Sequence, residues 1–200
     1  MRIEHQFSIA GFEVSVSFPD GWDADTLLPS FRPFYGKKEG QEKALLKCTV
    51  CTSVENKAAM PSGELIENTL SDMGYVSLYK EAEGYCVTLS AEQGGTLHVM
   101  QADRCFSVVS VFLHEEDKRA GHALSSLLRI AYSQAVLYWD AVSIHASAVF
   151  CENQAFLFMG KSGTGKSTHS ALWLKYIPGT ELLNDCLLYT SDAADDTPCV

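Results

Sequence analysis

The chain has 200 residues, of which 46% are hydrophobic and 20% charged, and its formal net charge at pH 7 is −10. This length can bury one good core, or a small domain beside part of a second. No apolar run approaches the roughly 18 residues of a membrane span, and the start lacks a signal-peptide pattern. The acidic net charge argues against nucleic-acid binding. The seven cysteines, an odd number at irregular spacings, are more typical of a protein in the reducing interior of a cell than of a disulfide framework. We expect a cytoplasmic protein with no nucleic-acid or membrane partner.

Residues 1–115 are expected to form a β-rich domain. Apolar–polar alternation or apolar composition, with turn signals between segments, predicts strands. These segments are 12–18, 44–52, 75–79, 85–89, 96–100 and 105–113. Their spacing favours an antiparallel sheet, so this part of the chain is predicted to be an α+β region.

Two further segments of this region lack the pattern of a strand. Prolines and glycines leave residues 27–40 irregular, whereas Ser62 could cap a short helix over 62–73 that Gly74 closes.

Cys48 and Cys51 form a C-x-x-C, but no second pair completes a zinc site. Cysteines three apart on a strand also point to opposite faces, so we interpret them as packing residues.

A helix is expected from about residue 117 to Asp140, because apolar residues recur at three- and four-residue steps along one stripe. The acidic stretch 115–117 precedes it. We place the domain boundary there, so that a second domain over 116–185 begins with this helix.

The stretch 160–167, Gly-Lys-Ser-Gly-Thr-Gly-Lys-Ser, fits G-x-x-x-x-G-K-[ST], the phosphate-binding P-loop. Its fixed positions match by chance in about one in a hundred chains of this length. The context also fits, because an apolar strand over 155–159 precedes the loop and a helix over 168–177 follows it, stopped by Pro178. The loop therefore predicts a nucleotide site rather than a glycine-rich turn that binds nothing.

The strands around this loop predict where its partners lie. Residues 142–150 and 155–159 are joined by a short polar turn, which predicts an antiparallel hairpin leading into the loop. Residues 181–185 form a short strand after the helix, and a strand–helix–strand unit should cross over right-handed and lie parallel. Its carboxyl end, with Asp185, then opens onto the same crevice as the loop.

The site residues follow from this arrangement. The backbone N–H groups of the loop should surround the phosphates, Lys166 should reach the β- and γ-phosphates, and Ser167 should bind Mg²⁺. Asp185 is the second candidate metal ligand, with a helix cap or surface acid as its alternative. The residues expected to bind ATP are Gly160, Lys161, Ser162, Gly163, Thr164, Gly165, Lys166, Ser167 and Thr168.

Two histidines lie near the loop in sequence. On its strand alone, His145 is better interpreted as a structural histidine than as a catalytic one. His169, just inside the helix after the loop, could face phosphate, but we interpret it as solvent-facing.

From His145 to Asp185 the chain resembles the HPr kinase/phosphorylase-like catalytic domain, which is related to ATP-dependent phosphoenolpyruvate carboxykinase. The resemblance rests on the loop, on a histidine fifteen residues before its first glycine, and on an acid ending a short strand. The resemblance covers 41 residues. Within the family, the chain looks most like a bacterial branch in which a β-rich N-terminal region precedes the segments HAS, GKSGTGKSTHS and LLND. The resemblance implies that His145 and Asp185 lie beside the transferred phosphate, with Asp185 acting as base and metal partner.

The chain departs from this family after Asp185. The family usually has a second aspartate there, whereas this chain has Cys186, which weakens the expected metal site. Residues 186–196 resemble the in-frame translation of a transposase-type sequencing adapter. We therefore expect the gene's own sequence to end near Asp185, with 186–200 as an artefactual tail; the alternative is a genuine acidic, disordered tail.

The resemblance implies a P-loop phosphotransferase that uses Mg-ATP, with Lys166, His145 and Asp185 as catalytic residues. The phosphoacceptor is an unidentified protein or small molecule, and the intact parent could form oligomers. A non-catalytic nucleotide-binding regulator and a carboxykinase-like enzyme stay open as alternatives. We expect a fragment that ends after its second parallel strand to be weakly active or inactive, and prone to aggregate.

Overall fold

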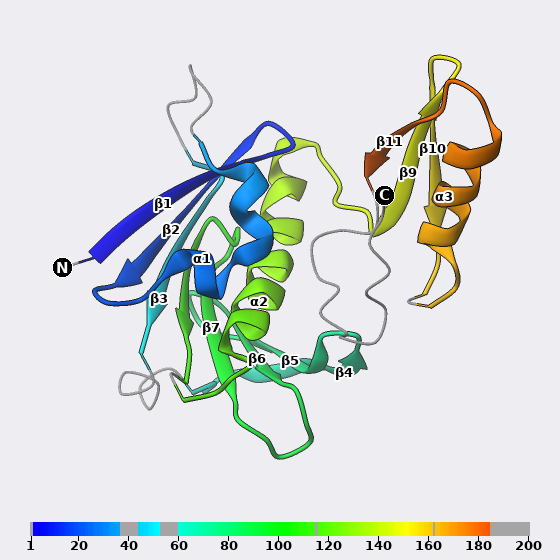
Figure 1. Ribbon diagram of the computed structural model, residues 1–200. Helices are drawn as coiled ribbons and strands as arrows, with labels where there is room; N and C mark the ends of the chain where they lie inside the picture. The colour runs from blue at the N-terminus through cyan, green and yellow to red at the C-terminus, as the bar shows by residue number, and fades with distance from the viewer. Residues whose placement is uncertain (1, 37–43, 53–59, 115, 162, 185–200) are drawn as a thin grey trace. The chain divides into compact units, whose positions relative to one another are not determined.

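The computed structural model describes residues 2–36, 44–52, 60–114, 116–161 and 163–184 (Figure 1). It divides into two compact units, Met1–Ser143 and Ile144–Val200. The sequence placed the boundary near residues 115–117, ahead of the long helix. In the structure the helix packs on the first sheet and belongs to the first unit, because its apolar stripe is buried there.

The first unit is built on one eight-stranded sheet with the order β1-β2-β3-β8-β7-β6-β5-β4. Neighbouring strands are antiparallel except at β2–β3 and β3–β8, which are parallel. The predicted antiparallel sheet is thus confirmed as a mostly antiparallel one. Its strands are β1 (Arg2–Ile9), β2 (Phe12–Pro19), β3 (Leu46–Cys51), β4 (Glu64–Ser71), β5 (Gly74–Lys80), β6 (Gly84–Ser90), β7 (His98–Asp103) and β8 (Val108–Phe112).

One long helix, α2 (Ala120–Ala135), lies along one face of this sheet (Figure 1). Its leucines 124, 127 and 128 are fully buried, as are alternate residues of the strands such as Val14 and Met100. The helix continues as the short 3-10 turn η3 (Val136–Trp139) and ends at Asp140, whose φ is 53°. The helix predicted to end by Asp140 is therefore confirmed, although regular α-helix begins only at Ala120.

The helix predicted over residues 62–73 is wrong, because this segment forms β4 and pairs with β5. Ser62 caps no helix: its N–H and hydroxyl both donate to the Glu81 carboxylate, at 2.8 Å each. The spacing of Ile66, Leu70 and Met73 mimics a helical stripe, but hairpin pairing closed by Gly74 overrides it.

Two other segments differ from the expectation. Residues 27–40, expected to be irregular, contain the end of α1 (Ala24–Leu27) and the 3-10 helix η1 (Pro29–Phe34) in their described part. Strand β1 was not expected, although Ile3, His5 and Phe7 alternate with polar residues. Phe7 is fully buried and pairs with Val14 of β2.

The second unit has three strands and one helix in its described part: β9 (Ala146–Cys151), β10 (Gln154–Met159), α3 (Lys166–Tyr176) and β11 (Glu181–Asn184). The strand order is β10-β9-β11, with both neighbours antiparallel to β9. The predicted hairpin is confirmed. β11 runs in the same direction as β10, as expected, but β9 lies between them, so no adjacent strands are parallel.

These elements do not show the HPr kinase-like domain that the resemblance implies. Helix α3 packs on one face of the small sheet, where the ring of Trp173 lies 4.7 Å from Phe156 and 5.6 Å from Phe158. Residues that alternate with these are exposed, Leu157 to 48% and Met159 to 68%. The other face is therefore apolar and uncovered in the described part of this unit.

Candidate nucleotide-binding site

The P-loop residues connect the end of β10 to the start of α3. Gly163 and Gly165 have φ of 76° and 85°, a left-handed conformation that costs other residues energy. At Gly160 the constraint is space, because an added Cβ would lie 2.7 Å from Oγ1 of Thr164. That hydroxyl donates to the Lys161 carbonyl at 2.7 Å, which tightens the turn. Backbone conformation thus favours glycine at 163 and 165, and the space beside Thr164 favours it at 160.

Lys166 lies at the first position of α3 and is only 7% exposed. Its ammonium donates to the carbonyls of Gly160 at 3.1 Å and Lys161 at 3.0 Å. A buried ammonium needs such acceptors, because an unpaired buried charge is costly. The charge is held within the loop, at the place where the motif predicts phosphate binding.

The amino end of α3 is open to an anion. Gly165 is its N-cap and supplies no side-chain cap, and no acidic residue stands in the first turn. The first N–H groups of a helix lack intrahelical acceptors and carry its positive dipole end. Together with Lys166 and the exposed Ser167 and Thr168, they give a donor set suited to phosphate.

The start of β9 and the carboxyl ends of β10 and β11 lie at the same end of the small sheet. Met159 pairs with Ala146, so Gly160 and His145 are the next residues beyond this pair on neighbouring strands. His145 is exposed and immediately precedes β9. Residue 184 of β11 pairs with Ala148, so β11 ends toward the same edge as β10. The strand directions therefore support the expectation that His145 and the end of β11, which Asp185 follows in the sequence, lie at the same end of the sheet as the P-loop.

Asp185 and Ser162 lie outside the described residues, and so does the tail 186–200. Among the residues that are described, no group of three or more His, Cys, Asp and Glu side chains could hold a metal ion. A Mg²⁺ site made by Ser167 and Asp185 therefore stays a prediction. Ser167 is exposed in the first turn of α3.

His169 was interpreted as solvent-facing and the C-x-x-C pair as packing residues; His169 is exposed, and Cys48 is buried. The His169 ring contacts Phe158 of β10, with 5.2 Å between centroids. Cys48 is buried, and burial raises the pKa of its thiol far above the ordinary value. A thiol held protonated in this way is a poor nucleophile and metal ligand.

Comparison with protein-family models, with curated proteins and with solved structures finds no match. The loop and its surroundings are therefore the features that point to a function. Within the described ranges, no helix combines the length and the apolar character that a membrane span requires.

Proposed function

We propose that this chain is an ATP-binding P-loop phosphotransferase resembling HPr kinase, which transfers the γ-phosphate to an unidentified acceptor. The observation that carries the proposal is the position of Lys166. Its buried ammonium lies against two loop carbonyls, beside a helix end that has neither a side-chain cap nor an acidic residue in its first turn. Positive charge and unpaired N–H groups at one point are the features that phosphate binding needs.

The proposed roles are distributed over one edge of the small sheet. Lys166 and the loop N–H groups bind the phosphates and balance the charge that spreads over the γ-phosphoryl group during transfer. Ser167 and Asp185 would hold Mg²⁺, which would help to balance the negative charge of the phosphates. As the γ-phosphoryl group moves to the acceptor and ADP leaves, the acceptor loses a proton, and Asp185 is the proposed base, with His145 beside it.

Replacing Lys166 tests the nucleotide site. We expect Lys166→Ala to abolish Mg-ATP binding in a calorimetric titration, because it removes the buried ammonium that lies against the loop carbonyls. Lys161→Ala is the matched control. It removes a charge from the same loop but leaves the Lys161 carbonyl in place, so it should weaken binding much less. Unchanged affinity in Lys166→Ala would rule out this site.

A nucleotide sensor is the second candidate, because Cys186 follows Asp185 where the related family has a second acid. A sensor binds ATP without consuming it, whereas a kinase consumes it when the acceptor is present. ATP consumption over time, measured with candidate acceptors and repeated after chelation of Mg²⁺, separates the two. A carboxykinase-like reaction is a third candidate and would be detected as decarboxylation of an organic acid.

A further inference from the structure

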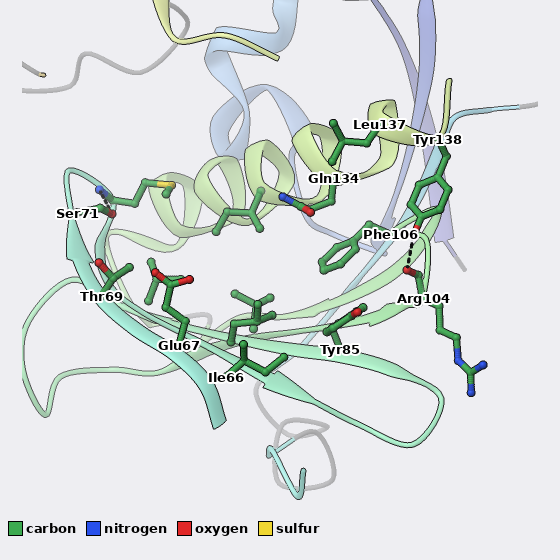
Figure 2. Close-up of a pocket in the computed structure, with 15 residues that line it drawn as sticks. Ile66, Glu67, Thr69, Ser71, Tyr85, Arg104, Phe106, Gln134, Leu137 and Tyr138 are labelled. Atoms are coloured by element: carbon green, nitrogen blue, oxygen red, sulfur yellow. Dashed lines mark hydrogen bonds between the residues drawn. The ribbon is translucent and has the colours of Figure 1, made fainter. Parts of the chain in front are cut away.

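The first unit contains a cavity of about 560 Å³ that the nucleotide site does not use. It lies between α2 with η3 on one side and strands β4 to β6 on the other (Figure 2). Volumes of about 300–1,000 Å³ are typical of small-molecule sites. Its walls are mainly apolar and are formed by Ile66, Met73, Val76, Leu78, Val87, Phe106, Ile130 and Leu137.

One of the residues that line this cavity is a strained aromatic residue. Phe106 has a φ of 55°, which is rare for a bulky residue, and its ring stacks on Tyr85 with 5.2 Å between centroids. The carboxylate of Asp103 holds the turn by accepting from the N–H and hydroxyl of Ser107, both at 2.7 Å. Strained residues of this kind cluster at binding sites, where surrounding bonds maintain them.

Two polar side chains line the cavity from opposite walls. Figure 2 shows Glu67 pointing from β4 toward the helix, and Gln134 lies alongside α2 on the opposite wall. Among the described residues, neither side chain has a hydrogen-bond partner. Both are therefore available to a ligand.

The charge around the cavity selects the kind of ligand. Arg104 is the only cationic residue among the lining residues, and its side chain points away from the cavity (Figure 2). It is 71% exposed and donates to the Ala82 carbonyl at 3.1 Å, near Glu83. An anionic ligand would thus meet the Glu67 carboxylate with no cation directed at it.

We propose that this cavity binds a small molecule that joins an apolar, ring-sized body to a protonated amine. The body packs on Phe106 and the aliphatic walls, and the ammonium donates to the Glu67 carboxylate. The residues that line this site belong to the first unit, and none of them is part of the proposed phosphotransferase site.

Three probes with similar bodies and different charge test the proposal: 2-phenylethylamine, 2-phenylethanol and 3-phenylpropionate. The full chain is titrated with each at pH 7 by calorimetry, and amide chemical-shift changes locate the binding. We expect the amine to bind most tightly and the carboxylate most weakly, with shift changes around residues 66–78, 104–106 and 130–138. Absence of binding by all three, or tighter binding of the carboxylate, would overturn the proposal.

Variants of two glutamates on β4 test whether Glu67 causes the preference for the amine. Glu67→Gln keeps the shape of the side chain and should reduce amine affinity about tenfold, removing the preference for amine over alcohol. Glu64→Gln makes the same change on β4 outside the cavity lining and should leave the affinities unchanged. An equal effect of both variants would mean that general surface charge, and not this cavity, attracts the amine.

Discussion

At the scale of single residues, the glycines of the P-loop give a sharp test of nucleotide binding. Gly163 has a φ of 76° and nothing within 4 Å of an added Cβ, so Gly163→Ala introduces backbone strain without a clash. We expect a loss of about 1–2 kcal/mol in unfolding free energy if the loop keeps its shape, or weaker ATP binding if it changes. Urea unfolding and ATP titration of the same variant measure both effects.

Gly179 provides the matched control for this substitution. Its φ is 77° and it also faces open space, but it lies at the turn after α3 and outside the loop. Gly179→Ala should therefore cost similar stability and leave ATP affinity unchanged. If both variants weakened ATP binding equally, the effect would come from global destabilisation and not from the loop.

His98 makes the stability of the first unit depend on pH. The ring is 2% exposed, and its Nε2 donates to Asp117 at 3.0 Å, while Nδ1 accepts the His114 N–H at 3.4 Å. This pattern fits neutral imidazole. Burial lowers the pKa of His98 below its ordinary value of 6.5, although the Asp117 carboxylate opposes the shift and His114 supports it.

A lowered histidine pKa means that the unfolded chain binds the proton more readily than the folded one. Stability is then fully present above pH 6.5 and falls as the pH drops toward the pKa of the folded state. Asp117 stays ionised there, because the Arg119 N–H lowers the pKa of its carboxyl. Urea unfolding at a series of pH values should show this fall. His98→Gln should flatten it, whereas His122→Gln, at a histidine outside this cluster, should not.

At the scale of elements, a buried hydroxyl pair joins helix α3 to its sheet. The side chains of Ser147 on β9 and Ser170 on α3 are hydrogen bonded, and both residues are almost fully buried. We expect Ser170→Ala to cost about 1–3 kcal/mol, because it removes a partner from a buried polar group. Since α3 begins with Lys166, loosening this contact should also weaken ATP binding.

A double-mutant cycle measures this contact directly. The double variant Ser147→Ala with Ser170→Ala should be less destabilised than the sum of the single variants, by about 1 kcal/mol. Urea unfolding of the four proteins provides the values. Strict additivity would show that the two hydroxyls do not stabilise the α3–β9 contact.

The elements also show why sequence alone succeeds in some places and fails in others. Helix α2 and the β9–β10 hairpin have local signals, namely an apolar stripe along a sixteen-residue helix and a two-residue turn. Strand β4 lies at the sheet edge, and almost all of its residues are exposed. Because neither face of the strand is buried, its sequence lacks the apolar–polar alternation of a half-buried strand. The spacing of its leucines and isoleucine instead suggests a helix. The state of β4 is decided by pairing with β5, which sequence spacing does not show.

At the scale of the whole molecule, the two candidate sites differ in how far sequence could reach them. The P-loop is one contiguous stretch, so its glycines and Lys166 are visible in the sequence. The cavity takes Glu67 from β4, Phe106 from the β7–β8 turn and Gln134 from α2. These residues come together only through the order β8-β7-β6-β5-β4, which depends on long-range pairing that no short motif encodes.

The uncovered face of the small sheet leads to a prediction about association. Leu157 and Met159 expose 48% and 68% of their surface on the face away from α3, and Leu183 exposes 55%. Contiguous apolar surface of this kind promotes contact between copies. We expect the chain to associate as its concentration rises, and Leu157→Lys to reduce this association while ATP binding persists.

Sedimentation velocity over a range of concentrations measures this association. Leu70→Lys is the control, because Leu70 is 64% exposed on the edge strand β4 of the first unit. If Leu157→Lys alone restores the monomer, the contact is made by the small sheet. If Leu70→Lys restores it instead, the copies pair through the open edge of the large sheet, as unpaired edge strands do. A monomer at all concentrations in the unmodified chain would contradict the prediction, and the exposed leucine and methionine would then be tolerated as ordinary surface residues.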